Sequence, residues 1–484
     1  MAASIVINMC TSKHFVMSTV LSRALQDVCR RKKQSVASLS NHYRRCYSSN
    51  SNILTLSERG IFKDIFPVAN SDLPKVLTSE PQCLYCGFDP TASSLHVGNL
   101  LAIIALLHCQ RAGHKPIALI GGATALVGDP SGKTKEREPL QSTVVQSNAA
   151  SIKDSLERIF TNHERYFWKE SKPLPQIRIM DNHSWYKDIN VISFLSGVGR
   201  KLRMGTLLSR QSVQTRLASD QGMNFAEFSY QLFQAYDFLH LHREHGCLIQ
   251  LGGTDQLGNL MTGHDLVKKV TGKEVYGIAI PLVTSSTGAK LGKTAGNAVW
   301  VNEDKTSPFD LYQYFVRLPD ADMERYLKLF TFLPLNEIDD IITKHKKTPK
   351  NRKAQEKLAE QVLLLVHGES GLDKAIRQTD ALYSTDPQSL EQLNATEITE
   401  LFRGASITSL LLEPGYSVGQ LLDRLKCLPQ GYRGEKILQG GGVYINHQRV
   451  TRADQVLING EHILNNNLTL VRIGKKNYYV VKWV

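Results

Sequence analysis

One stretch near the start of the chain alternates between strand and helix patterns, and this alternation restricts the fold more than any other feature. Residues 84–88 are short and apolar, residues 95–109 have the length and apolar periodicity of a helix, and residues 115–120 form a second apolar run. A strand, a helix and a strand in this order form a βαβ unit, whose strands lie parallel. We therefore expect an α/β fold in which ligands bind beyond the carboxyl ends of the strands.

The composition excludes several other classes of protein. With 484 residues the chain is long enough for about three domains. Its 42% hydrophobic and 21% charged residues are ordinary for a globular protein, so the bulk of the chain is neither collagen-like nor disordered. The longest apolar run, residues 100–107, is too short to span a bilayer, and we expect no membrane partner. Eight cysteines in this length indicate a reducing compartment rather than a disulfide scaffold.

The net charge of +13 is concentrated at the two ends of the chain. Residues 1–50 hold eight Lys or Arg and one acid in a Ser-rich and Arg-rich segment, which is typical of an organellar transit peptide, mitochondrial rather than chloroplast. The alternative is a disordered basic tail that binds RNA weakly. Residues 416–484 hold ten Lys or Arg and four acids, and this excess points to a polyanionic partner. The remaining residues are neutral overall.

Segments rich in glycine and cations follow the predicted strands. Backbone N–H groups and the dipole at a helix start favour phosphate, and two ammonium groups on a glycine-hinged loop can clamp a leaving pyrophosphate. Each feature alone is weak, because a lone His at a helix start is more often structural and a Lys-x-x-Lys turn is usually solvated. Their co-occurrence favours a phosphate site. The side chains concerned are His96, Asn99, Lys133, Arg137, Lys290 and Lys293.

A second set of polar residues indicates a pocket for a small polar substrate. Residues 225–245 have a helix pattern, and the spacing of Tyr230, Gln234 and Asp237 places them on one face of it. The alternative is an ordinary helix lying on the surface. Residues 248–251 then form a strand that leads into the polar segment 252–256. We therefore expect the polar face of the helix and the polar segment 252–256 to meet at one edge of the sheet.

Cys83 and Cys86 are spaced as in some metal and redox motifs, but we expect neither function for them. A zinc site would need a second pair of ligands, and a thioredoxin-like pair would begin a helix instead of lying in a strand.

Together these motifs resemble the bacterial-type tyrosyl-tRNA synthetase family of class I aminoacyl-tRNA synthetases, in particular its mitochondrial members. The resemblance runs from about residue 56 to the last residue and implies a Rossmann-like parallel-sheet catalytic domain. Asn99 stands where the HIGH signature of the class has a second histidine, and Leu257 where relatives commonly carry tryptophan. The matching segments are 85–91, 96–99 (HIGH), 121–124, 128–130, 252–256 and 290–294 (KMSKS).

The resemblance implies a role for each matching residue. Tyr85 and Asp237 would bind the phenol hydroxyl of tyrosine, supported by Asn182. The full set implied for tyrosine is Tyr85, Asp129, Asn182, Tyr230, Gln234, Asp237 and Gln256. The set implied for ATP is Cys86, Asp89, Thr91, His96, Asn99, Asp255, Lys290 and Lys293. The catalytic set, which would stabilise the phosphates and the departing pyrophosphate, is His96, Asn99, Lys133, Arg137, Lys290 and Lys293. ATP with Mg²⁺ is the implied cosubstrate, with no protein-bound metal.

The resemblance also implies a division into domains. After the transit peptide at 1–50, it implies a catalytic domain at 51–306, an α-helical anticodon-binding domain at 307–400, a linker at 401–415 and a small α+β S4-like RNA-binding domain at 416–484. The alternatives are a capping or exposed acid for Asp320 and a merely solvated basic surface for the last domain. The residues implied for RNA binding are Asp320, Arg433, Lys436, Lys475 and Lys476.

The sequence thus predicts a tyrosine–tRNA ligase that forms tyrosyl-adenylate and charges tRNA(Tyr) in the mitochondrial matrix, as a homodimer. One alternative is the sister tryptophanyl enzyme. The pair Tyr85 and Asp237 argues against it, because an indole N–H needs no donor beside its acceptor. The other alternative is a non-catalytic RNA-binding or splicing cofactor on the same fold, which the retained lysines and polar pocket argue against as a sole role.

Overall fold

The computed structural model describes residues 52–67, 72–133, 135–284, 286, 291–294, 297–383, 388–403, 405–474 and 477–484. The predicted transit peptide, Lys290, Lys475 and Lys476 lie outside these residues, and Lys293 is described by its backbone alone. The chain divides into two compact units. Among the described residues, unit 1 comprises those from Asn52 to Ser93, Asn99–Lys153 and Glu170–Val283, and unit 2 comprises Ser94–Gly98, Asp154–Lys169 and those from Thr284 to Val484.

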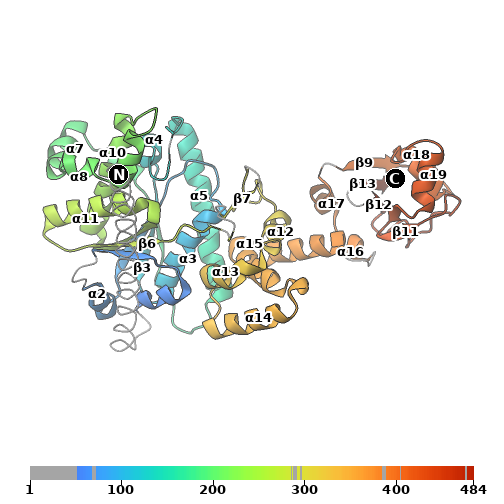
Figure 1. Cartoon of the computed structure of the whole chain (residues 1–484), viewed down its shortest axis with the longest axis horizontal. Helices are drawn as coiled ribbons and strands as arrows, with labels where there is room; N and C mark the ends of the chain where they lie inside the picture. The colour runs from blue at the N-terminus through green and yellow to red at the C-terminus, as the bar shows by residue number, and fades with distance from the viewer. Residues whose placement is uncertain are drawn as a thin grey trace, which may run out of the picture. The chain divides into compact units, whose positions relative to one another are not determined.

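Unit 1 is built on a six-stranded sheet with the strand order β1-β6-β5-β2-β3-β4 (Figure 1). Neighbouring strands from β6 to β4 are parallel, and only β1 is antiparallel, to β6. The short apolar runs suit strands covered on both faces. The predicted α/β class and the predicted strand at 115–120 are confirmed. The strands are β1 (Asp64–Phe66), β2 (Cys83–Phe88), β3 (Lys115–Ile120), β4 (Arg178–Asp181), β5 (Cys247–Gly253) and β6 (Tyr276–Ile280).

The strand order reverses at β2. From β2 the chain passes to β3 and β4 on one side, and it then returns to β5 and β6 on the other side. In open parallel sheets such a reversal leaves a crevice at the carboxyl ends of the two central strands. Here those ends are Phe88 of β2 and Gly253 of β5.

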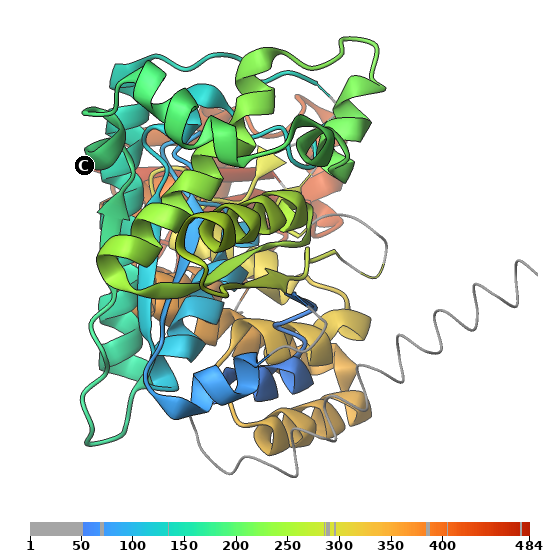
Figure 2. The same ribbon diagram turned by 90° about the vertical axis from the view of Figure 1, so that its left-hand side faces the viewer.

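Helices α10 (Phe225–His245) and α11 (Leu257–Thr271) pack together beside this sheet (Figure 2). Phe238 and Leu266 of these helices share a buried apolar cluster with Ile117 and Tyr85 of the strands. Asn224 caps the start of α10 by accepting a hydrogen bond from the Glu227 N–H, so helix 225–245 is confirmed at both ends. Other helices that lie wholly or partly in unit 1 are α2 (Leu73–Ser79), α3 (Val97–Arg111), α4 (Thr124–Val127), α5 (Ser142–Asn162), α6 (His183–Tyr186), α7 (Val191–Gly197), α8 (Met204–Leu208) and α9 (Gln211–Leu217).

Unit 2 contains a group of helices and a small sheet. The region implied as α-helical at 307–400 begins with two separate helices, because Pro319 cannot continue a helix and a short 3₁₀ turn follows it. Gly368, at φ 70°, breaks α15, and a Cβ there would lie 3.2 Å from Oδ1 of Asn162. The helices are α12 (Pro308–Val316), α13 (Met323–Phe330), α14 (Leu335–Lys347), α15 (Lys353–Tyr383), α16 (Gln388–Glu391), α17 (Ala395–Leu401), α18 (Val418–Leu425) and α19 (Tyr432–Gln439).

The small sheet has the strand order β11-β10-β12-β13-β9. The segment predicted as a linker, 401–415, differs from that prediction, because β9 lies in it and pairs in parallel with β13. Three of the five residues of β9 are Ser or Thr and the strand lies at a largely exposed sheet edge, so it lacks the apolar run of a central strand. The strands are β9 (Ser406–Leu410), β10 (Val443–Ile445), β11 (Gln448–Val450), β12 (Leu468–Ile473) and β13 (Asn477–Trp483), besides a separate two-stranded pair, β7 (Lys293–Thr294) and β8 (Asn297–Ala298). In the described part of the chain, no helix has the length and apolarity needed to cross a bilayer.

Candidate active site

The buried carboxylate of Asp237 is the centre of a polar network in unit 1. The Asn182 amide nitrogen donates to Oδ2 of Asp237 at 3.0 Å, and the indole nitrogen of Trp185 donates to Oδ1 at 3.0 Å. Asn182 is itself held by the Ala123 N–H and by the Thr124 hydroxyl. Burial raises the pKa of Asp237 to about 7 despite these donors.

The side chain of Tyr85 reaches the same region from β2. It is only 1% exposed, and its ring meets the edge of Phe238 with the centroids 5.4 Å apart. Its hydroxyl has no hydrogen-bond partner among the described residues, and neither has Oε1 of Gln234 on α10. Burial, followed by the charge of Asp237, raises the pKa of Tyr85 well above its usual range, so the phenol keeps its proton. Buried polar atoms without partners mark a place where a ligand completes the network.

Asp89, which follows β2, lies against Tyr230 of α10. The Tyr230 hydroxyl donates to Oδ2 of Asp89 at 2.8 Å, and the Thr124 hydroxyl donates to Oδ1 at 2.8 Å. Burial, followed by the charge of Asp129, raises the pKa of Asp89 to about 6. Asp89, predicted to meet ATP, therefore lies beside a residue predicted to bind tyrosine.

Asp129 and Gln256 form a second contact between distant segments. Nε2 of Gln256 donates to Oδ2 of Asp129 at 2.7 Å, and the Ser131 N–H donates to Oδ1 at 2.9 Å. The amide of Asn259 donates to Oε1 of Gln256 at 3.0 Å. Arg137 donates from Nε to the Asp129 main-chain carbonyl at 2.9 Å. Burial raises the pKa of Asp129.

The other described residues predicted for ATP or for the phosphates in unit 1 differ in burial. Cys86 is buried, and burial raises its pKa to about 12, so it remains a thiol. Gly132 has φ 67°, and a Cβ there would lie 3.3 Å from Oδ2 of Asp255, so this glycine lets its loop approach Asp255. Thr91 and Asn99 are half-buried, and Lys133 is exposed.

Within unit 2, the segment containing His96 lies against the loop at Leu291-Gly292. The Val97 N–H donates to the Val299 carbonyl at 2.9 Å, and the Val299 N–H donates to the Gly292 carbonyl at 2.8 Å. Gly292 has φ 84°, and a Cβ there would lie 3.2 Å from the Gly98 nitrogen. The two predicted signature segments, 96–99 and 290–294, are thus connected through their described residues.

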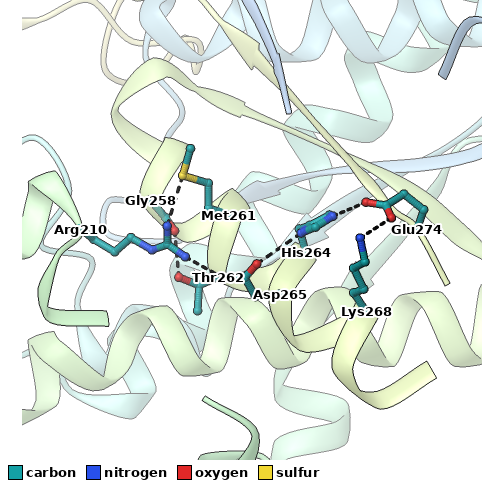
Figure 3. Close-up of polar contacts among 8 residues, drawn as sticks. All are labelled: Arg210, Gly258, Met261, Thr262, His264, Asp265, Lys268 and Glu274. Atoms are coloured by element: carbon teal, nitrogen blue, oxygen red, sulfur yellow. Dashed lines mark hydrogen bonds and ion pairs between the residues drawn. The ribbon is translucent and has the colours of Figure 1, made fainter. Parts of the chain in front are cut away.

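Helix α11, which carries Asn259, is fixed by a chain of charged side chains (Figure 3). The guanidinium of Arg210 bonds Oδ2 of Asp265 at 3.0 Å. The imidazole of His264 lies between two carboxylates, 3.4 Å from Asp265 and 2.5 Å from Glu274. Lys268 reaches the second oxygen of Glu274 at 2.8 Å. This network anchors the helix without entering the polar pocket.

Among the polar residues bonded to the predicted site residues, Thr124, Ser131, Trp185 and Asn259 were not themselves predicted. Thr124 lies within a segment noted for its glycines, and Trp185 follows the predicted Asn182 by three residues. The sequence could have indicated these residues only because each is polar and some lie near a predicted residue. Their hydrogen bonds depend on tertiary contacts that the sequence does not show.

Of the residues predicted for RNA binding, the described ones are Asp320, Arg433 and Lys436, and they belong to unit 2. Asp320, Glu324, His345 and Lys346 help to line a cavity of about 350 Å³. Oδ1 of Asp320 accepts from Nε2 of Gln355 at 2.5 Å and lies 3.0 Å from Nε2 of His345. Arg433 and Lys436 are exposed on α19. No group of three or more His, Cys, Asp or Glu placed to hold a metal occurs among the residues that the structure describes.

Comparisons with known proteins agree with this geometry. Residues 78–384 match the family model described as "tRNA synthetases class I (W and Y)". The chain is 50% identical over 468 residues to the mitochondrial tyrosine–tRNA ligase of Drosophila melanogaster, covering 96% of this chain and 98% of that one. It is 52% identical over 448 residues to the human mitochondrial tyrosine–tRNA ligase, covering 91% and 94%. A C-terminally truncated mitochondrial tyrosyl-tRNA synthetase of Aspergillus nidulans superposes with a TM-score of 0.63 at 34% identity, covering 73% and 100%.

A parallel sheet with a polar crevice at its switch point and the family match together define a class I aminoacyl-tRNA synthetase. Within that class the chain belongs to the tyrosyl-tRNA synthetase family, as its mitochondrial relatives and the solved structure establish. The predicted resemblance and fold class are confirmed.

Proposed function

We propose that this chain joins tyrosine to tRNA(Tyr) in the mitochondrial matrix, by way of tyrosyl-adenylate. The ligase activity follows from the family, and the mitochondrial relatives favour the compartment. One observation carries the amino-acid assignment. The Tyr85 hydroxyl is buried without a partner in the region of Asp237. A ligand phenol can donate to the carboxylate and accept from Tyr85, which matches the chemistry of tyrosine.

The remaining pocket residues suit the amino-acid backbone. Asp129, Tyr230 and Gln234 are proposed to hold the α-ammonium and carboxylate, with Asp89 close to Tyr230. A bound ammonium favours the ionised forms of the buried carboxylates, whose pKa values are raised in the empty pocket. Binding the cation therefore removes part of the cost of burying these acids.

The adenylation step needs no protein nucleophile. The tyrosine carboxylate attacks the α-phosphorus of ATP, an oxygen–phosphorus bond forms, and the bond to pyrophosphate breaks with its electron pair. The enzyme contributes by alignment and by stabilising the spreading negative charge. Mg²⁺ is proposed to enter with ATP. The side chains proposed for these tasks are His96, Asn99, Lys133, Arg137, Lys290 and Lys293, with Cys86, Thr91, Asp255 and Gln256 beside the nucleotide.

ATP–pyrophosphate exchange tests the pocket. The wild-type chain should exchange with tyrosine and not with tryptophan or phenylalanine. Tyr85→Phe should raise the KM for tyrosine about tenfold, the value of one hydrogen bond of about 1.4 kcal/mol. Exchange driven by tryptophan would overturn the assignment.

Two further variants separate binding from chemistry. Asp237→Ala should abolish tyrosine-dependent exchange while tRNA binding remains, and Asp188→Ala, at an exposed aspartate of unit 1, is the matched control. Lys290→Ala should lower the adenylation rate more than the affinity for tyrosine. An equal loss of exchange activity in Asp237→Ala, Lys290→Ala and the control Asp188→Ala would refute the roles proposed for Asp237 and Lys290.

The C-terminal half is proposed to bind tRNA through the helical domain at 307–400 and the S4-like domain at 416–484. The cavity beside Asp320 is large enough for a nucleobase, and Arg433 and Lys436 are exposed cations on one helix. Lys475 and Lys476 are proposed to join them. Lys436→Ala should weaken tRNA binding and lower the slope of log affinity against log salt by about one. An unchanged slope would exclude the contact.

A homodimer is proposed on the face formed by α7, α8 and α9. Val191, Ile192, Leu195, Met204 and Leu217 there are all apolar and exposed, Ile192 at 69%. Such gatherings mark protein interfaces, and a second copy is the occupant that the family favours. Ile192→Asp should shift sedimentation from dimer to monomer, whereas Leu411→Asp, at an equally exposed leucine of unit 2, should not.

Residues 1–50 are proposed to direct import. Fused to a reporter, they should carry it into mitochondria, and the chain lacking them should still charge mitochondrial tRNA(Tyr). A fused reporter that stays in the cytosol would contradict this role.

A further inference from the structure

Two buried cysteines from distant parts of the chain meet at the amino ends of β2 and β5. Cys83 and Cys247 are register partners on these adjacent parallel strands, so their side chains leave the same face of the sheet. The register shifts immediately after this pair, between Cys83 and Leu84. The Cys247 thiol donates a hydrogen bond to the Ile249 carbonyl at 3.6 Å. The two thiols therefore lie side by side on adjacent strands, away from the carboxyl ends that carry the proposed amino-acid pocket.

The surroundings of Cys83 favour its thiolate. A guanidinium nitrogen of Arg178, on β4, lies 3.9 Å from the Cys83 sulfur. The neighbouring Cys247 thiol, together with the charges of Arg178 and Lys115, outweighs burial and lowers the pKa of Cys83. Burial raises the pKa of Cys247, so this thiol keeps its proton. Cys83 is 6% exposed and Cys247 is not exposed, so small molecules meet Cys83 first.

The other described cysteines lack this environment. Cys86 lies three residues along the strand from Cys83, so its side chain points to the opposite face and cannot pair with it. Burial raises the pKa of Cys86 to about 12 and that of Cys109 further. Cys427 is more exposed than Cys83, but burial raises its pKa to about 11. The thiolate is the reactive form of cysteine. Cys427 is the more exposed of the two cysteines, but Cys83 is therefore expected to be the more reactive one.

We propose that Cys83 and Cys247 form a peroxide-oxidisable dithiol, with Cys83 as the attacking sulfur and Cys247 as the resolving one. The Cys83 thiolate attacks one oxygen of hydrogen peroxide, an S–O bond forms, and the O–O bond breaks to release hydroxide. The Cys247 sulfur then displaces the oxygen of the Cys83 sulfenic acid as water. Starting from the thiolate, the pair loses two electrons and the single proton of Cys247, and the released hydroxide takes a proton from solvent, so one peroxide becomes two waters.

The strand pairing allows the cross-link. Neighbouring strands lie about 4.8 Å apart, and disulfides form across Cα separations of about 4.4–6.8 Å. The register shift beside the pair supplies the local irregularity that lets two facing side chains turn toward each other.

Site-resolved mass spectrometry of the full native chain tests the proposal. After treatment with one equivalent of hydrogen peroxide and alkylation of the free thiols, a linked Cys83–Cys247 peptide should appear and should vanish with dithiothreitol. Cys83 should be oxidised about tenfold faster than the more exposed Cys427. Oxidation of Cys427 first, or no linked peptide, would overturn the proposal.

Variants assign the two roles. In Cys247→Ser, dimedone should label Cys83 because its sulfenic acid has no resolving thiol. Cys109→Ser is the matched control at a buried cysteine and should form the link as the wild type does. Arg178→Gln should slow Cys83 oxidation, and Arg178→Lys should restore part of the rate. Labelling of Cys247 in Cys83→Ser at the wild-type rate would reverse the assignment and refute it.

Discussion

The indole nitrogen of Trp185 lies 3.0 Å from Oδ1 of Asp237. With Asn182 on the other oxygen, the carboxylate is held from both sides and its orientation is fixed before any substrate arrives. Trp185 therefore acts as a positioning residue for the proposed phenol contact.

Replacing Trp185 by phenylalanine removes that donor while keeping an aromatic ring. We expect the KM for tyrosine in pyrophosphate exchange to rise about tenfold, the equivalent of about 1.4 kcal/mol, with a smaller change in kcat. Trp168→Phe, in unit 2, is the control. An unchanged KM would show that Asn182 alone positions the carboxylate.

Tyrosine binding should depend on pH. Burial raises the pKa of Asp89 to about 6 and that of Asp237 to about 7, and a protonated carboxyl binds an ammonium or accepts a phenol proton poorly. The dissociation constant for tyrosine, measured by calorimetry, should therefore increase as the pH falls from 8 to 5.5. Asp237→Asn should remove the upper of the two transitions. A flat profile would contradict the assignment.

The same two acids should make stability fall with rising pH. Their folded pKa values lie above the value of about 3.9 for an unfolded aspartate, so between about pH 4 and 7 the folded state binds more protons. Their contribution to the free energy of unfolding therefore decreases across that window. Urea denaturation should show a flatter dependence for Asp237→Asn than for the wild type, and parallel curves would argue against the raised pKa.

Arg216 and Glu227 form an ion pair 2.6 Å long, at 1% and 3% exposure. Arg216→Met leaves a buried charge on Glu227 and should lower the free energy of unfolding by about 3–5 kcal/mol. The double variant Arg216→Met with Glu227→Leu should recover much of the loss, because it leaves no unpaired charge. Urea denaturation measures both, and additive losses would contradict the coupling.

His264 should stabilise α11 most when it is protonated. Burial lowers the pKa of His264, but the hydrogen bonds to Asp265 and Glu274 outweigh burial and raise it overall. This stabilisation is full below the unfolded value of about 6.5 and is lost as the pH rises through the folded pKa. His264→Gln should lower Tm more at pH 6 than at pH 9, with Lys273→Gln as an exposed control. Equal losses at both pH values would show that the imidazole is neutral.

Sequence patterns predicted the helices and strands whose formation depends on their own residues. The helix pattern predicted the helix at 225–245, and an apolar run predicted the strand at 115–120. Strand β9 was not predicted, because it gains its place by pairing with β13, more than sixty residues later. The partner of Cys83 was not predicted either, since 163 intervening residues leave no local signal.

Of the predicted site residues, Asp237, Asn182, Tyr230 and Asp89 are joined by hydrogen bonds in one network, through Thr124. Their roles toward tyrosine and ATP remain predictions. The structure shows in addition that the Thr124 hydroxyl links Asp89 to Asn182, which the sequence did not predict.

The reversal of strand order at β2 affects how the enzyme folds during its synthesis. Tyr85 and Asp89 are translated long before Tyr230 and Asp237, which face them across the crevice. A nascent or severed polypeptide that stops near residue 200 would lack Tyr230 and Asp237, so the hydrogen-bond network with Asp89 and Asn182 could not form. Two complementary fragments, one ending and one beginning near residue 200, would complete that network only by reassembling the sheet.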